Sequence, residues 1–161
     1  MSRDVSLSRS AVLDAPAAAV FAQLEDFHAW EHWSPWEKVD ADLNRKYSGP
    51  ERGVGARYEW SGNRAAGAGS MEIVEASAGR QVAIDLRFSK PIKATNPTVF
   101  TLNPLGPERV EVTWTMTSRR GLLLSLFARV VKLDAMLGTQ FEEGLESLGR
   151  AARAEPGTGQ R

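Results

Sequence analysis

Hydrophobic and polar positions alternate with a period of two near the N-terminus and again from residue 39 to residue 118. Since successive side chains of a strand point to opposite faces, this period predicts strands with one buried face. Gly, Pro and Asn separate the segments at hairpin spacing, which favours a meandering antiparallel sheet. The predicted strands are Val5–Leu13, Val39–Tyr47, Ala56–Ser61, Ser70–Ala76, Gln81–Ser89, Thr98–Asn103 and Arg109–Ser118.

Helical patterns occur on either side of the strand-rich region. Asp14-Ala15-Pro16 opens one short helix, and a second short helical segment runs from Phe27 to Trp33. A much longer pattern runs from about Leu122 to Arg153. One long helix can cover seven strands only if the sheet curls around it, which leaves a space between them. The sequence therefore predicts one α+β domain over residues 1–153 and a disordered polar tail at 154–161.

Strand parity predicts which side chains line this space. Tyr58 and Trp60 share an apolar face, whereas Arg57 and Glu59 lie on the opposite, charged face. A wall rich in Trp and Met fits a binding cavity, although the same large rings also suit an ordinary core. The predicted ligand-binding residues are Tyr58, Trp60, Met71, Phe88, Phe100, Trp114, Met116, Phe127, Asp134, Leu137 and Phe141.

Asp134 lies near the centre of the apolar stripe of the long helix, four residues after Val130 and three before Leu137. An unpaired buried carboxylate costs on the order of several kcal/mol, so this one must meet a donor, a water-filled space or a ligand. It is the candidate catalytic residue, a general acid/base with a raised pKa. The alternatives are a structural acceptor for Trp, Tyr or backbone N–H groups, or a pair with Arg9 on the apolar parity of the first strand.

Two other motifs suggest sites but favour ordinary structural explanations. His28 and His32 stand four residues apart, yet no third ligand accompanies them, so we expect two surface histidines and no metal. The glycine-rich segment Gly49–Gly55 joins two strands and lacks the lysine of a phosphate-binding loop. A mobile hairpin loop is the better interpretation, and we predict no cofactor.

Composition narrows the classes of function. Lys+Arg and Asp+Glu number 20 each, and no basic stripe appears, so nucleic acid is not an expected partner. The chain has no Cys, which excludes disulfides, thiolate nucleophiles and Cys-ligated zinc. The longest apolar run, Leu122 to Ala128, is too short to span a bilayer. We therefore expect no membrane insertion and, because no signal-peptide pattern opens the chain, a cytoplasmic protein.

Several motifs occur together along the chain. They are Asp26–Lys38, Gly49-Pro50 with Gly53-Val54-Gly55, Tyr58–Asn63 with Gly67, Gly69 and Met71, Val112–Met116, and Leu133-Asp134 with Gly138, Phe141-Glu142 and Gly144-Leu145. Together they resemble a bacterial branch of the SRPBCC superfamily, the START and polyketide cyclase/dehydrase-like relatives of the plant pathogenesis-related allergens. The resemblance covers Val5 to Ala152. It implies a helix-grip fold, in which an antiparallel sheet wraps a long C-terminal helix around a hydrophobic cavity.

The resemblance implies binding of a small hydrophobic molecule: a lipid, a sterol-like compound or an aromatic polyketide-like compound. Asp134 and Tyr58 would then orient the ligand. One alternative is a cyclase/dehydratase-type enzyme in which Asp134 moves a proton. Another is a stress-linked accessory protein that acts through a protein partner, and a homodimer is compatible with each. Binding ranks above catalysis because the sequence places no second catalytic group opposite Asp134.

Overall fold

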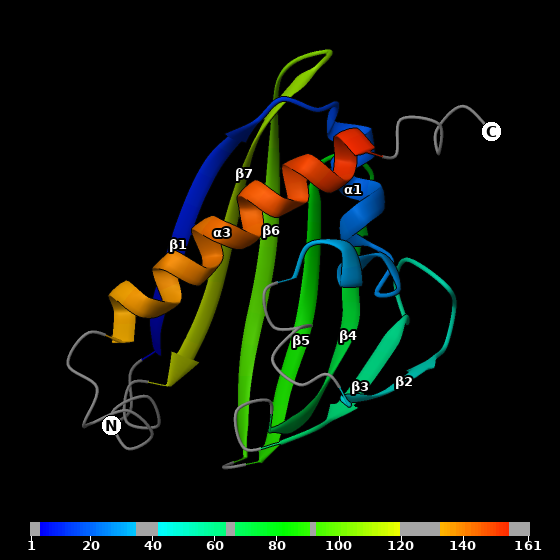
Figure 1. The fold of residues 1–161 in the computed structure, drawn as a ribbon, viewed down its shortest axis with the longest axis vertical. Helices are drawn as coiled ribbons and strands as arrows, with labels where there is room; N and C mark the ends of the chain where they lie inside the picture. The colour runs from blue at the N-terminus through cyan, green and yellow to red at the C-terminus, as the bar shows by residue number, and fades with distance from the viewer. Residues whose placement is uncertain (1–3, 35–41, 64–66, 91–92, 120–132, 155–161) are drawn as a thin grey trace.

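A computed structural model describes residues 4–34, 42–63, 67–90, 93–119 and 133–154. Its described strands form one antiparallel sheet in the order β1-β7-β6-β5-β4-β3-β2 (Figure 1). Consecutive strands from β2 to β7 are neighbours, whereas β1 and β2 lie at opposite edges and β1 pairs with β7. The strands are β1 (Asp4–Leu13), β2 (Asn44–Ser48), β3 (Arg57–Ser61), β4 (Ala68–Ser77), β5 (Gln81–Lys90), β6 (Ala94–Gly106) and β7 (Arg109–Arg119).

The helical segments of the described chain are α1 (Ala17–Leu24), the 3₁₀ helix η1 (Ala29–His32) and α3 (Leu133–Ala154). They lie on one face of the sheet, with α3 crossing it diagonally from the β1 edge towards α1 (Figure 1). In the described chain α3 packs against β1 and α1, and α1 packs against β6 and β5. This is the predicted helix-grip arrangement. Residues 122–132 of the predicted long helix lie outside the described residues.

Local chemistry explains the two short helical segments. Pro16 caps the N-terminus of α1 with a φ of −65°, a value that proline fixes in advance, and alanines fill the first turn. The segment predicted from Phe27 to Trp33 is a shorter 3₁₀ helix. The indole of Trp30 donates to the carbonyl oxygen of Leu24 at 3.0 Å, which holds η1 against the end of α1.

Predicted strand boundaries were wrong at both ends of β6 and at the start of β2. β6 runs from Ala94 to Gly106 rather than from Thr98 to Asn103. Pro97 does not end the strand, because the pairing with β7 stops at Thr98 and the missing N–H of Pro97 breaks no pairing there. Beyond that pair β7 and β6 diverge in Figure 1. β2 starts at Asn44: residues 42 and 43 belong to no strand, and residues 39–41 of the predicted strand lie outside the described residues.

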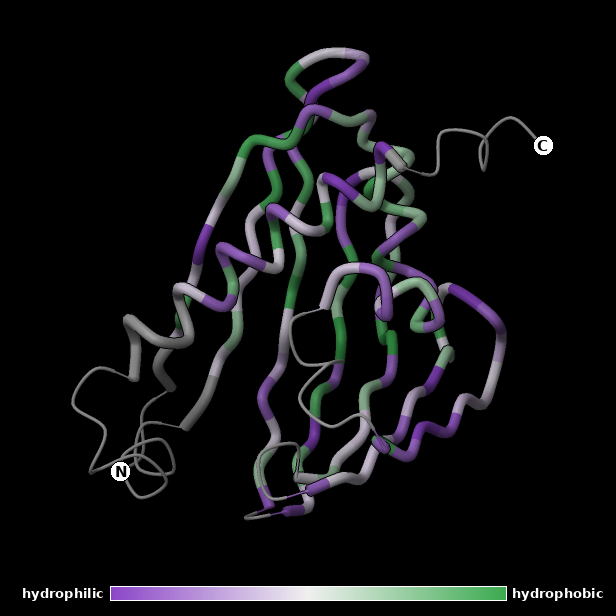
Figure 2. The backbone as a smooth tube through the Cα atoms, in the orientation of Figure 1, coloured by the Kyte–Doolittle hydropathy of each residue, from purple (hydrophilic) through white to green (hydrophobic). Residues whose placement is uncertain are grey.

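The two faces of the sheet differ as parity predicts. Hydropathy alternates along the central strands in Figure 2. On the outer face, Ser8 and Ser10 of β1 form hydroxyl–hydroxyl hydrogen bonds of 2.6 and 2.7 Å with Thr115 and Thr113 of β7. Arg57 contacts two carboxylates on the same face. The helices cover the apolar face, here called the inner face.

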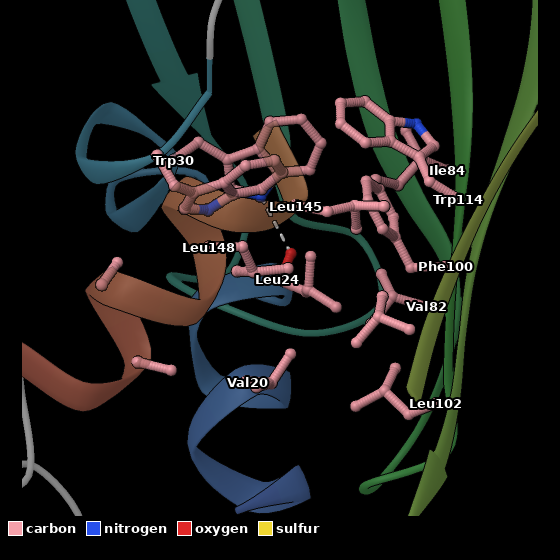
Figure 3. Close-up of a cluster of buried hydrophobic side chains, with 14 of the residues drawn as sticks. Val20, Leu24, Trp30, Val82, Ile84, Phe100, Leu102, Trp114, Leu145 and Leu148 are labelled. Atoms are coloured by element: carbon pink, nitrogen blue, oxygen red, sulfur yellow. Dashed lines mark hydrogen bonds between the residues drawn. The ribbon is translucent and has the colours of Figure 1, made fainter. Parts of the chain in front are cut away.

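A dense core joins the inner face to α3. Phe100 of β6 lies 4.8 Å from Trp114 of β7, ring centroid to ring centroid, and Trp114 stacks on Phe141 of α3 at 4.2 Å and 2°. Leu145 and Leu148 point from α3 into the same cluster, towards side chains of the sheet and of α1 (Figure 3). This packing fixes the C-terminal half of α3 on the sheet.

Leu148 and Leu105 allow a matched test of this core, because Leu148 is fully buried and Leu105 is 51% exposed. We expect Leu148→Ala to lower the free energy of unfolding by about 2–5 kcal/mol, through lost burial and the cavity that remains. Leu105→Ala should change it by less than about 0.5 kcal/mol. Urea denaturation followed by circular dichroism measures both, and equal small losses would contradict the assigned core.

Candidate functional site

The inner face is covered unequally along its strands. At the end where α1 and η1 lie, the sheet contributes fully buried side chains such as Val82, Phe100 and Val112. In Figure 1, α3 crosses β1 and β7 and continues towards α1, so the opposite ends of β3, β4 and β5 lie away from it. Several apolar side chains at those ends are only partly buried.

We call this less covered region the distal patch. Cross-strand pairing places its members on one face: Asn96 opposite Leu86, Leu86 opposite Met71, and Phe88 opposite a glycine that faces Trp60. Trp60, Leu86, Phe88 and Met116 are half-buried. The distal patch consists of Trp60, Met71, Leu86, Phe88, Asn96 and Met116.

Trp60 is held in the distal patch by its neighbours. A Cβ atom on Gly69, in the adjacent strand, would lie 2.6 Å from Cη2 of the Trp60 ring, so the indole needs a glycine there. Phe88 meets Trp60 edge to face, with ring centroids 5.8 Å apart and an interplanar angle of 89°. Tyr58 also stacks with Trp60, with ring centroids 6.2 Å apart. These contacts fix an aromatic surface in place.

Asn96 is the polar member of the distal patch. The residue is 8% exposed. Its carboxamide oxygen is buried and has no hydrogen-bond partner, and no other side-chain oxygen or nitrogen among the described residues combines these two properties. Leaving such a group unpaired costs about 1–3 kcal/mol. The neighbouring Thr98 is satisfied, because its hydroxyl donates to the Asn96 backbone carbonyl at 3.0 Å. Buried unpaired groups in native proteins call for an explanation, and ligand binding is one.

The predicted ligand-binding residues separate into three groups. Trp60, Met71, Phe88 and Met116 lie in the distal patch. Tyr58 and the aromatic stack of Phe100, Trp114 and Phe141 are fully packed. Phe127 lies outside the described residues. Asp134 and Leu137 lie in the N-terminal part of α3, and their side chains are outside the described part.

Arg9 occupies the inner face, as its parity predicts, opposite Trp114 in the β1–β7 pairing. Its Nε atom lies 3.6 Å from a carboxylate oxygen of Glu142, and its Nη1 donates to the Ser8 carbonyl at 2.8 Å. The ion pair that the structure describes for Arg9 is therefore with Glu142, eight residues after Asp134 in α3. Both partners are substantially exposed, so the pair contributes little to stability.

The two histidines have separate local partners. Nδ1 of His28 lies 3.1 Å from the Asp26 carboxylate, and the imidazole stacks on Tyr47 at 3.9 Å. Nδ1 of His32 lies 3.4 Å from the side-chain oxygen of Gln23. Within the described ranges, no three His, Cys, Asp or Glu side chains gather in a way that could hold a metal ion.

The glycine-rich segment does join β2 to β3, as predicted, and it packs on the end of α1. The Gly53 N–H donates to the Glu25 backbone carbonyl at 3.0 Å. Burial raises the pKa of the Glu25 carboxyl above its ordinary value, Arg52 opposes this increase, and Asp26 adds to it.

Sequence reasoning missed Asn96 as a site residue and left Leu86 out of the ligand-binding set. The signal for Asn96 was present, because Phe100 and Leu102 face inward and the same parity continues back through Thr98 to residue 96. Pro97 hid it by suggesting that the strand began later. The exposure of Leu86 depends on where α3 crosses the sheet, which no local pattern contains.

Comparison with known families and structures agrees with this architecture. The family model described as "Polyketide cyclase / dehydrase and lipid transport" matches residues 4–153. No curated protein matches the chain. None of the helices in the described ranges has the length and apolar character needed to cross a membrane.

Solved structures share the fold at low sequence identity. A Thermobifida fusca protein has a TM-score of 0.64 at 23% identity, covering 93% of this chain and 95% of its own. Thalictrum flavum norcoclaurine synthase, in complex with dopamine and hydroxybenzaldehyde, has a TM-score of 0.68 at 6% identity, covering 96% and 89%. The Aha1 dimer from Colwellia psychrerythraea has a TM-score of 0.63 at 15% identity, covering 96% and 98%.

The raised pKa of Glu25 predicts a pH-dependent gain in stability when the charge is removed. The folded state binds the Glu25 proton more tightly than the unfolded state does. Ionisation of this carboxyl therefore lowers the stability of the fold as the pH rises through the pKa of the unfolded state and then through the pKa of the folded state. Glu25→Gln should therefore raise the melting temperature at neutral pH and lose this advantage below the ordinary pKa of glutamate. Thermal melts across pH measure it, with exposed Glu143→Gln as control; parallel profiles for the two variants would contradict the prediction.

Proposed function

We propose that this chain, which belongs to the polyketide cyclase/dehydrase and lipid transport family, binds a small hydrophobic molecule on the inner face of its sheet, at the distal patch. The family match over residues 4–153 places the chain in the SRPBCC superfamily and supports a ligand-binding or cyclase-type role. The observation that carries the proposal is the distal patch itself, an apolar and aromatic surface that the described helices leave partly uncovered.

The contrast between the two ends of the inner face supports ligand binding. One end is closed by stacked rings, with Phe100 and Trp114 fully packed against Phe141. At the other end Trp60 and Phe88 keep exposed surface. Removing apolar surface from water is favourable by about 25 cal/mol per Å², so the apolar area that a ligand covers on these rings contributes to its affinity. The packed aromatic stack would close the site at its end nearer to α1.

The shape of the distal patch favours a flat, mostly apolar ligand. Trp60 and Phe88 meet at nearly a right angle, which presents one ring face and one ring edge to a bound molecule. A ring system or a lipid chain fits such a corner. The norcoclaurine synthase of the same fold is in complex with dopamine and hydroxybenzaldehyde, which are small aromatic molecules, and this supports the proposed size class.

Two alternatives rest on other observations. An enzyme of the cyclase/dehydratase kind would use Asp134 in α3 as acid/base and Tyr58 to stabilise an oxyanion. The polar member of the distal patch, Asn96, is an amide that exchanges no proton near neutral pH, so the described residues favour binding over catalysis. The likeness to the Aha1 dimer is the basis for considering a protein partner or a homodimer.

Native mass spectrometry of gently purified protein tests the proposal. We expect the wild-type chain to carry a small molecule in stoichiometric amount and Phe88→Ala to carry much less of it, because truncating the ring removes about 1–3 kcal/mol of contact, which lowers the affinity by roughly 5-fold to 150-fold. Val12→Ala, an exposed position on the outer face of β1, is the control and should keep the ligand. The proposal would be contradicted if the purified wild-type protein carried no ligand and neither lipids nor aromatic polyketides changed its melting temperature.

Asp134→Asn separates a binder from a catalyst. Because an amide keeps an acceptor oxygen but cannot transfer the proton, we expect the variant to bind the co-purified molecule within about threefold of the wild-type affinity. Fluorescence titration measures the binding, and chromatography of the incubated ligand detects any product. Turnover by the wild type that falls by orders of magnitude in the variant would favour the enzyme alternative.

A further inference from the structure

We infer that Asn96 selects ligands with a hydroxyl or N–H group, by accepting a hydrogen bond from that group within the distal patch. The inference rests on the proposed function and adds a polar requirement to it. Its basis is the buried carboxamide oxygen of Asn96, which has no partner among the described residues although apolar side chains surround its position on the inner face.

The register fixes where the ligand's donor group must lie. Asn96 is directly opposite Leu86, and Phe88 is its diagonal neighbour on the same face of β5. Diagonal neighbours on paired strands lie roughly 7–8 Å apart, about the width of one substituted aromatic ring. A ligand ring that rests against Phe88 can therefore place a hydroxyl on the Asn96 oxygen.

The pairing of the strands leaves β6 with one unpaired edge at this position. Pro97 has no N–H, and the β6–β7 pairing ends at the next residue, Thr98, which is opposite Met116. From that pair onward β7 departs from β6 in Figure 1, while β5 stays paired with β6 as far as Ala94. Asn96 thus lies on a stretch of β6 that is paired on one side.

Two other polar side chains of the inner face in the described chain are already engaged. The Thr98 hydroxyl is already bonded to the Asn96 backbone carbonyl, and Arg9 is paired with Glu142. Apolar contacts with Trp60 and Phe88 attract hydroxylated and unsubstituted rings alike. Discrimination between the two therefore falls to the carboxamide, since a buried acceptor that stays unpaired penalises the ligand that lacks the donor.

Two probes of matched shape test this inference: 2-naphthol, which has a hydroxyl, and 2-methylnaphthalene, which has a methyl group in its place. We expect the wild-type protein to bind 2-naphthol about tenfold or more tightly, as measured by quenching of tryptophan fluorescence. Asn96→Leu, which keeps the volume and removes the acceptor, should abolish the preference and bind 2-methylnaphthalene at least as tightly as the wild type does.

Thr98→Val is the matched control, because it alters the adjacent inward-facing polar residue, whose hydroxyl is satisfied inside the chain. It should keep the wild-type preference for 2-naphthol. The melting temperature without ligand gives a second readout: Asn96→Leu should raise it, since the variant removes an unpaired buried group, whereas a structural asparagine would make it fall.

The outcomes distinguish the two proposals. Equal binding of both probes by the wild type, or a preference that survives in Asn96→Leu, overturns the role of Asn96 and leaves the binding site standing. A lower melting temperature of Asn96→Leu likewise overturns it. Binding of neither probe by the wild type overturns the inference and counts against the proposed function as well.

Discussion

The apolar face of a seven-stranded sheet must be shielded from water. In this chain the stack of Trp114 on Phe141 holds α3 over that face. The two rings join β7 to α3 at nearly parallel planes, and Phe100 extends the stack onto β6. With α3 fixed there, α1 and η1 close the same end of the sheet. The rest of the architecture follows from where this stack holds the helix.

Because the stack lies towards one end of the inner face, coverage by the described helices is uneven. The strands continue beyond it to a region where Trp60, Phe88 and Met116 keep part of their surface exposed. Clustered exposed apolar side chains mark binding sites more often than isolated ones do. The same constraint that builds the core thus leaves the surface to which we assign ligand binding.

The polar groups of the inner face likewise differ in whether they have a partner. Arg9 reaches Glu142 at the edge, where water still screens the pair, and Thr98 satisfies its hydroxyl within its own strand. Asn96 is as buried as the core but has no partner for its oxygen in the described chain. An apolar residue there would avoid the cost of burying an unpaired oxygen, and we assign this oxygen to recognition of a donor group on the ligand.

The period of two, the turn residues and the helical stripe by themselves indicated the strands, the helices and a sheet curled around one long helix, because secondary structure and facing depend on local spacing. The helix-grip fold itself came from the resemblance of the sequence motifs to the SRPBCC superfamily. Parity likewise put Trp60, Phe88 and Met116 on the inner face. Only the tertiary structure decided which inward residues stay half-exposed and that the Asn96 carboxamide oxygen has no partner within the described ranges. Those properties depend on where α3 crosses the sheet and where the β6–β7 pairing ends, and both are set by contacts between segments far apart in the chain.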